Sequence, residues 1–495
     1  GYTYLMQLVG HDLVDAVVGY EVDDDELVSI QDGARRRKLC LETLYGAGPE
    51  EQPHAYAIDE VDLFQFGAAP RIALRLGPHA GPAPAGGRYC PMRDIARAAP
   101  GAAHCLDPGL TSAAHRRLLT EAMLADPRND AHALLSQFVV LFQLFHNDVV
   151  EALRGPAIDD RALRRDIAYR VYHCARGLVT DVYREVLIAD ALPRLLDPRV
   201  MKRYAERRLP LFQEGAAAPA EFAHGVFRFG HAMVRDSYFI NSGAVQETRV
   251  AMQLSSAARP ASLPLDDQWF VDWARFFDMP GGRAANRSMP IGPHYAAALW
   301  DETAIPPLDS DTDVAGLADR DLLASAYAGL LSVRTLHAQL RSAFGEDVSP
   351  DWQVWRDAIA AWLEADNATA SGGRLLSRID VERIAYDPPL AFFTLFEAGV
   401  GAGEDKADGR RLGPLASFVM AETIFGAIAH FPIGFEREAG LGARIRARVA
   451  TMLGAAPHAA AARRAIEPLA DAAPNSMPEL LDYLRRRGAF RNAGG

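Results

Sequence analysis

A single histidine in an apolar segment, residues 227–231, is the first candidate for chemistry in this chain. If the segment is helical, Arg228 lies one turn before His231 on the same face, together with His224 and Arg235. Histidine can ligate haem iron through Nε2 while Nδ1 donates to a second acceptor, and an arginine one turn away can contact a haem propionate. Taken alone, a helical histidine is more often a hydrogen-bonded or surface group, so the assignment depends on other residues.

A second pair, Gln7 and His11, lies near the start of the chain at a spacing of four residues. On a helix this spacing points an amide and an imidazole at the same small ligand. A neutral histidine in such a place can move a proton from one oxygen of a peroxide to the other. The alternative is an ordinary capped or surface histidine.

The segment from Asp126 to Asp130 precedes a strongly apolar stretch and offers a third candidate, Arg128. Asn129 or Asp130 can serve as the N-cap of the following helix, in which case Arg128 is a surface charge. Alternatively, Arg128 lies in the same pocket and stabilises the charge that develops as an O–O bond breaks, because a guanidinium is always protonated. Together, the three segments indicate a haem enzyme that cleaves peroxide.

The elements that must position these residues are mostly helices, because apolar residues recur at helical spacing along most of the chain. The stretches with this spacing are residues 4–19, 132–153, 161–195, 221–240, 319–343, 351–366, 412–430 and 477–487. No strand alternation is sustained, and the Gly- and Pro-rich loops do not separate halves of different composition. We therefore expect a mainly α protein with long loops and little β-structure, folded as one domain over residues 1–495.

Composition limits the class of protein. A chain of 495 residues with 49% hydrophobic residues can bury a large core. The net charge of -12 argues against a nucleic-acid or anionic-membrane partner, since phosphate binding needs a basic field. The longest apolar stretch, residues 415–435, contains Glu422 and His430 and predicts a buried helix, so no transmembrane segment is expected. No pattern indicates the oligomeric state.

The four cysteines, at positions 40, 90, 105 and 174, lack the paired spacing of a zinc site. Cys90 and Cys105 flank a loop, and either a disulfide or a reduced pair fits the sequence. The chain begins at Gly1 with neither a methionine nor a signal-peptide pattern, so we expect the natural N-terminus to be missing. We expect a soluble protein, with the cytoplasm favoured over secretion.

Several segments, in order along nearly the whole chain, resemble the animal-type haem peroxidase (peroxidase–cyclooxygenase) superfamily, especially its bacterial branch. Residues 1–13 resemble the distal helix, and residues 41–49 resemble the calcium-loop segment. Residues 126–130 with His146 and Asn147 resemble the arginine segment and its downstream His-Asn pair, with the same spacing of 18 from Arg128 to His146. Residues 227–231 resemble the proximal helix. Three later segments also fit the bacterial pattern: residues 389–393, 412–415 and 421–422.

The resemblance implies a fold in which haem lies between a distal and a proximal helix. It implies that His11 is the distal acid and base, with Gln7 as its neighbour and Arg128 as the distal arginine. His231 would be the proximal iron ligand, and Arg228 would contact a propionate. Such a set implies a haem peroxidase that reduces hydrogen peroxide and oxidises a small organic or lipid substrate through an oxoferryl intermediate.

Some positions depart from the family pattern. Mammalian members bind haem through ester bonds at the positions of Gly10 and Ala131, so we expect haem b to be bound non-covalently. The acceptor for the proximal histidine, usually asparagine, aligns with Asp321, and a carboxylate would give the ligand imidazolate character and lower the iron potential. A competing interpretation makes Asp321 an ordinary charge on a helix surface. The arginine expected three residues later is Ala324, which removes one propionate contact.

The family also binds calcium, through the aspartate that follows the distal histidine and through several loop positions. The aspartate corresponds to Asp12, and the loop positions align with Arg36, Lys38, Cys40 and Glu42. Asp12 and Glu42 offer the hard oxygen ligands that calcium prefers, but Cys40 replaces a carboxylate. We expect a degraded or absent calcium site, where Arg36 or Lys38 supplies positive charge instead.

Two alternatives remain open. A fatty-acid dioxygenase of the same superfamily needs a tyrosine near the haem, but its expected position, three residues before His231, is Arg228; Tyr172 or Tyr238 could take that part. A non-catalytic descendant, used for haem binding or interaction, would explain the lost ester and calcium positions. Retention of Gln7, His11, Arg128, Arg228 and His231 argues against it.

Overall fold

The structure is a computed structural model, and it describes most of the 495-residue chain. The described residues are 1–14, 39–58, 71–80, 87–98, 120–154, 161–207, 210–211, 218–243, 245–256, 259, 262–280, 284–305, 316–369, 375–403, 405–429 and 439–490. This part of the chain is mainly α-helical, and its strands form only short antiparallel pairs. The predicted fold class is therefore confirmed.

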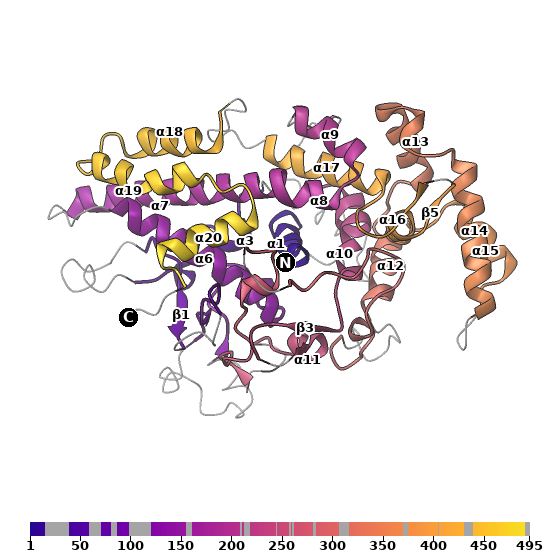
Figure 1. Ribbon diagram of the computed structural model, residues 1–495, viewed down its shortest axis with the longest axis horizontal. Helices are drawn as coiled ribbons and strands as arrows, with labels where there is room; N and C mark the ends of the chain where they lie inside the picture. Colours follow the sequence, from indigo (N-terminus) through magenta and orange to yellow (C-terminus); the bar gives the residue numbers. More distant parts are fainter. Residues whose placement is uncertain are drawn as a thin grey trace.

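Long helices stack around a continuous apolar core (Figure 1). These helices are α6 (Ala133–Arg154), α7 (Arg161–Val186), α18 (Leu441–Leu453), α19 (Ala459–Ala472) and α20 (Met477–Arg487). α18 packs on both α7 and α19, and α6 packs on α7 and α19. The predicted final helix, residues 477–487, matches α20 at both ends.

α6 is long and apolar enough to cross a membrane by length and composition, but 89% of its most apolar stretch is buried inside the described structure. That burial is typical of the core helix of a globular protein. The predicted buried helix at residues 415–435 corresponds to α17 (Pro414–Ala429), whose residues from Pro414 to Ile428 are buried. The remainder of that stretch lies outside the described residues.

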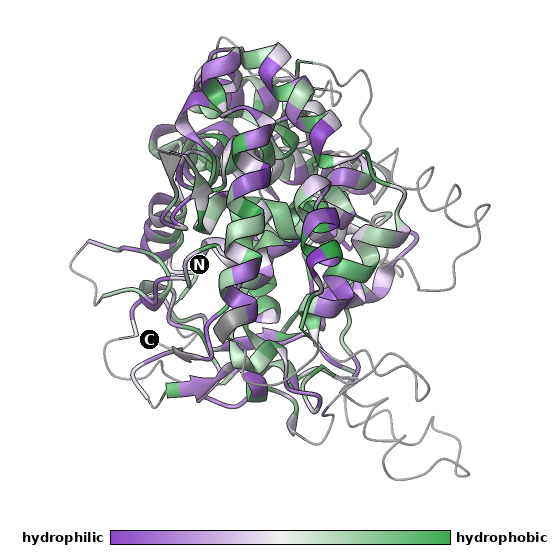
Figure 2. Ribbon diagram, turned by 90° about the vertical axis from the view of Figure 1, so that its right-hand side faces the viewer, coloured by the Kyte–Doolittle hydropathy of each residue, from purple (hydrophilic) through white to green (hydrophobic). Residues whose placement is uncertain are grey.

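A second group of helices forms the other end of the molecule. It contains α9 (Pro198–Arg207), α12 (Leu317–Tyr327), α13 (Val333–Phe344), α14 (Trp352–Thr369), α15 (Arg378–Tyr386) and α16 (Leu390–Gly399). Figure 2 shows this end, where hydrophilic and hydrophobic residues alternate along the helices as amphipathic packing requires. The prediction of one helix over residues 319–343 is wrong, because Gly329 has a φ of +62° and Ser332 caps a new helix through Thr335 N.

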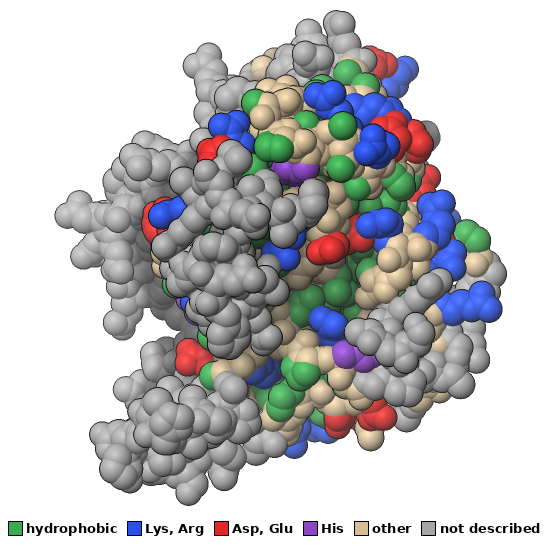
Figure 3. Space-filling model, turned by 90° about the vertical axis from the view of Figure 1, so that its left-hand side faces the viewer, with side chains coloured by type: hydrophobic (Ala, Val, Ile, Leu, Met, Phe, Trp, Pro, Cys, Tyr) green, Lys and Arg blue, Asp and Glu red, His purple; other side chains and the backbone are tan. Residues whose placement is uncertain are grey.

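Further helices and strands complete the described part of the fold. The helical ones are α1 (Tyr2–Leu13), α3 (Glu42–Tyr45), α8 (Leu192–Leu195), α10 (Phe229–Ala232) and α11 (Thr248–Met252). The strand pairs are β1 (Leu76–His79) with β2 (Arg93–Ile95), β3 (Ser237–Phe239) with β4 (Val245–Glu247), and β5 (Gly401–Ala402) with β6 (Asp405–Lys406). On the face shown in Figure 3, acidic and basic side chains are interspersed.

The predicted continuous helix over residues 221–240 is wrong. This segment contains a π-helix (Glu221–Gly225), a 3-10 turn (Val226–Arg228), the short α10 and then β3. Gly225 has φ -117° and ψ -88°, and a Cβ on it would lie 2.5 Å from Leu390, so the chain unwinds where it passes α16. The expected stripe is therefore lost: Arg235 follows the end of α10 and donates to the carbonyl of Arg287.

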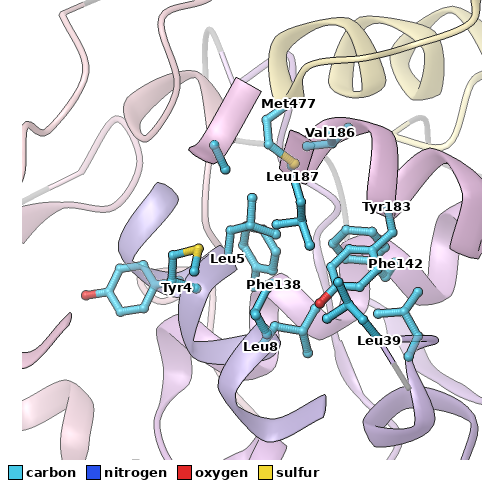
Figure 4. Packing of buried hydrophobic residues seen from close by; sticks show 14 of the residues in the cluster. Tyr4, Leu5, Leu8, Leu39, Phe138, Phe142, Tyr183, Val186, Leu187 and Met477 are labelled. Carbon is cyan, nitrogen blue, oxygen red and sulfur yellow. The ribbon is translucent and has the colours of Figure 1, made fainter. Parts of the chain in front are cut away.

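α1 is one of the three segments that carry the candidate site. Its buried face places Leu5 and Leu8 against Phe138 and Phe142 of α6 and close to Tyr183 of α7 (Figure 4). With this face fixed in the core, Gln7 and His11 lie on another side of α1, where they line a cavity. The rest of the stretch predicted as helix 4–19 lies outside the described residues.

Candidate active site

A cavity of about 250 Å³ lies between α1 and the segment that ends in α10. Its lining includes all five side chains that the sequence singled out: Gln7, His11, Arg128, Arg228 and His231. These residues come from three segments far apart in the chain, so only the tertiary fold brings them together. A larger cleft of about 1230 Å³, beside α9, α16 and α17, contains none of them.

His11 has a defined partner for its Nδ1 atom, which lies 3.0 Å from Oδ1 of the buried Asn129. The amide NH₂ of Asn129 donates to the carbonyl of Thr43 at 3.0 Å, which fixes Oδ1 as the end that faces His11. Because an amide oxygen can only accept, Nδ1 of His11 must carry the hydrogen. In the neutral ring Nε2 then has the lone pair, which is the form a general base needs.

Arg128 lines the cavity, but its guanidinium points elsewhere. Nε and Nη2 donate to the carboxylate of Asp126, at 3.0 and 2.6 Å, and Nη2 also donates to the carbonyl of His11 at 2.7 Å. Nη1 donates to the carbonyl of Val14. Arg128 therefore satisfies carbonyls at the end of α1 and holds the backbone of His11 in place.

The expectation that Asn129 or Asp130 caps the following helix is wrong, because α6 begins at Ala133 and the side chain of His132 accepts from Leu135 N. Asp126 caps the 3-10 helix Pro127–Asp130 by accepting from Arg128 N. Burial opposes ionisation of Asp126, but hydrogen bonds and charge from Arg128 outweigh it and lower the pKa of that carboxyl. Asp130 instead forms a buried ion pair with Arg97 at 2.9 Å.

His231 pairs with the carboxylate that the alignment suggested. Its Nδ1 lies 2.7 Å from Oδ2 of Asp321, which is buried on α12. The hydroxyl of Tyr295 donates to the same oxygen at 2.7 Å. Asp321 is therefore not a charge on a helix surface, as the competing interpretation had it.

Arg228 lies on the other side of the same carboxylate. Its Nε is 3.8 Å from Oδ1 of Asp321, and neither of these buried atoms has a hydrogen-bond partner in the described part of the chain. A buried guanidinium N–H without a partner is costly and is satisfied by an anionic ligand.

His224 was expected on the same helical stripe as Arg228 and His231. It is buried, and burial together with the charge of Arg228 lowers its pKa to about 4.

Sequence reasoning missed two residues of the site, Tyr295 and His132. Tyr295 lies in a loop, where no periodicity points to it, and its ring centre is 6.3 Å from that of His231. His132 lines the cavity directly before α6, and its Nε2 lies 2.9 Å from Oε1 of Gln7. Its place next to the arginine segment was the one signal available.

The candidate calcium residue Asp12 is fully buried next to α3. Its carboxylate accepts from the backbone N–H groups of Leu41, at 2.8 Å, and Thr43, at 3.4 Å. Burial raises its pKa to about 6, partly offset by these hydrogen bonds. Glu42 accepts from the thiol of Cys40. No group of three or more potential metal ligands occurs among the described residues, and residues 36 and 38 lie outside them.

We predict that calcium does not stabilise this protein, because N–H groups already occupy the carboxylate oxygens of Asp12. Thermal melts in calcium and in EDTA should coincide. A site with a Kd a hundredfold below the calcium concentration would stabilise the fold by about 2.7 kcal/mol. A rise in melting temperature of corresponding size, lost in Asp12→Asn, would contradict this prediction.

Other residues that carried the resemblance have structural contacts. His146 lies between the hydroxyl of Tyr45 and the carbonyl of Ile72, and Asn147 pairs with both backbone groups of Leu74.

The structure also shows the positions of Tyr172 and Tyr238, the two tyrosines considered as radical carriers of a dioxygenase. Tyr172 bonds to Tyr56, and Tyr238 accepts from Arg235 N; neither is among the residues that line the cavity. Cys105 lies outside the described residues.

The donor set of the cavity fits haem. His231 has a carboxylate-anchored imidazole, and Arg228 has an unsatisfied buried donor for a propionate. A side chain on Gly230, next to His231, would meet nothing within 4 Å. The volume of about 250 Å³ is below the ~300–1,000 Å³ of typical ligand pockets, so haem entry requires side chains to move apart. The ring of Phe227 packs close to α1, since a Cβ on Gly10 would lie 2.5 Å from it.

The cavity of this mainly helical protein thus brings together three histidines from separate segments, His11, His132 and His231. The family model described as animal haem peroxidase matches residues 107–298, which confirms the resemblance to that family. The matched span includes Arg128, Arg228 and His231. It leaves out Gln7, His11 and Asp321, which the fold brings to the same site. No curated protein matches the chain.

Proposed function

We propose that this protein is a haem-dependent peroxidase that reduces hydrogen peroxide and oxidises a small organic or lipid donor. The observation that carries the proposal is that acceptors hold the Nδ1 atoms of two of the three histidines that line the cavity, Asn129 for His11 and Asp321 for His231. In each ring Nε2 is thereby the basic nitrogen. One histidine is thus suited to ligate a metal and the other to accept a proton.

In this proposal His231 and Arg228 would hold a non-covalent haem b, which would supply the redox chemistry for peroxide reduction. Nε2 of His11 would accept a proton from peroxide and return it to the leaving oxygen. Asp321 keeps the His231 ring oriented and electron-rich. The absence of a carboxylate at positions 10 and 131 supports haem without ester links.

The part of Arg128 in this proposal differs from that of a free distal arginine. Its charge is paired with Asp126, and its contact with the His11 carbonyl makes it a positioning residue for His11. Release from Asp126 would be needed before Arg128 could stabilise charge in the cavity.

One observation favours the dioxygenase alternative. Tyr295 lies beside His231, and Tyr4 lines the cavity, so tyrosines suitable as radical carriers are present. However, the hydroxyl of Tyr295 already donates to Asp321. The same enzyme preparation distinguishes the two functions: hemin-loaded protein should oxidise phenolic donors only with peroxide. Peroxide-independent uptake of oxygen with a polyunsaturated fatty acid would instead establish the dioxygenase.

A further inference from the structure

His132 contacts both the start of α6 and the polar face of α1. It is the residue directly before α6, and its Nδ1 accepts from the backbone N–H of Leu135 at 3.2 Å, as the side chain of a helix N-cap does. On the other side of the ring, Nε2 lies 2.9 Å from Oε1 of Gln7 on α1. One imidazole thus connects the start of α6 to the polar face of α1.

The two contacts fix the tautomer of His132. Because a backbone N–H donates to Nδ1, that nitrogen carries a lone pair, and a neutral imidazole then has its hydrogen on Nε2. Burial and the nearby His11 lower the pKa of His132 to about 4, so the ring is neutral at physiological pH. A helix N-terminus also disfavours a cation. Nε2 of His132 therefore donates to Oε1 of Gln7.

The amide of Gln7 has an oxygen, which accepts hydrogen bonds, and an NH₂ group, which donates them. The contact with His132 decides which of the two faces His132 and which faces away from it. Oε1 is bound to His132, so the NH₂ group is turned away from it. Both residues line the cavity, and no described residue accepts a hydrogen bond from Nε2 of Gln7. The NH₂ group is thus available to a ligand.

We propose that His132 is a positioning residue that sets the direction of the Gln7 amide, so that the cavity presents an N–H donor to its ligand. The proposal deepens the peroxidase function and rests on it for the identity of the ligand. The ligands it favours carry a lone pair or a negative charge at this point, such as an oxygen of peroxide or a small anion. A sequence with the same Gln7 and no His132 would leave the amide free to turn either way.

The chain offers a matched pair of variants. His132→Asn retains a good helix cap but is too short to reach Gln7, whereas His132→Ala loses both contacts. Fluoride, a haem ligand that accepts hydrogen bonds, is the probe, and its affinity for the hemin-loaded protein is read from the absorption spectrum. We expect a loss of about 2- to 12-fold in both variants, the value of one hydrogen bond. Carbon monoxide, a weak acceptor, should bind the reduced variants as it binds the native protein.

A double-mutant cycle tests whether His132 acts through Gln7. In a Gln7→Leu background, His132→Asn should cause no further loss of fluoride affinity. Unchanged fluoride affinity in His132→Asn, or an equal loss in the Gln7→Leu background, would overturn the proposal.

A second measurement does not depend on haem. Long-range ¹H–¹⁵N spectra of hemin-free protein labelled with ¹⁵N-histidine should show His132 protonated at Nε2 and unprotonated at Nδ1 at neutral pH, with the signals assigned by their loss in His132→Asn. The other tautomer, or a doubly protonated ring, would overturn the proposal. Failure to bind hemin would overturn the proposed peroxidase function. The spectrum of the hemin-free protein would still show whether His132 donates to Gln7.

Discussion

Replacing His11 with leucine is expected to slow the reaction with peroxide by about 10²- to 10⁴-fold, the usual contribution of a positioned acid–base group. The structure gives the reason: Asn129 holds the proton on Nδ1, which makes Nε2 the proton acceptor. The measurement is stopped-flow absorption of the hemin-loaded protein mixed with hydrogen peroxide. Hemin affinity should stay near the native value, because His231 is unchanged.

The control for this prediction is His173→Leu, since His173 is an exposed histidine that does not line the cavity. It should react with peroxide at the native rate. A His11→Leu protein that retains the native rate would show that His11 is not the acid–base group, whatever its place in the cavity.

Two substitutions around His231 should shift the iron reduction potential in opposite directions. Asp321→Asn removes the charge behind the imidazole, so the potential should rise, and haem affinity or activity should fall by about 10- to 100-fold. Tyr295→Phe removes an O–H donor from the same carboxylate oxygen, which leaves Asp321 a stronger acceptor. The His231 ring then gains imidazolate character, and the potential should fall.

Spectroelectrochemical titration of the three hemin-loaded proteins measures both shifts. Opposite signs distinguish an electrostatic role from simple damage to the site, since damage would move both variants the same way. Equal potentials in the native protein and Asp321→Asn would mean that the carboxylate does not act on the iron ligand.

Helices with a complete apolar face could be predicted from the sequence, because burial alone determines them. α6, α14, α17 and α20 follow the predicted ranges within a few residues. The segment before His231 could not be predicted, because its irregular course depends on the close approach of Leu390 to Gly225. Local periodicity contains no information on such a contact.

The candidate site also contains features that the sequence predicts and features that depend on tertiary contacts. The sequence and the resemblance pointed to five of the residues that line the cavity, and to Asp321 as the partner of His231. They did not point to His132 or to the bond between His11 and Asn129. Asp126 binds the guanidinium of Arg128 within one short segment, whereas the contact of His132 with Gln7 depends on how the start of α6 meets α1. A sequence shows that Arg128 is charged, but only the fold shows where that charge is directed.

The central claim is that His231 ligates haem and that the bound haem reacts with peroxide. The most direct test is the absorption spectrum of the purified protein titrated with hemin, for the native chain, for His231→Ala and for the exposed-histidine control His54→Ala, followed by a pulse of hydrogen peroxide. We expect a Soret band in the native protein and in His54→Ala that shifts when peroxide is added, and a weakened or altered band in His231→Ala. A native protein that binds no hemin, or a Soret band that is the same with and without His231, would contradict the account.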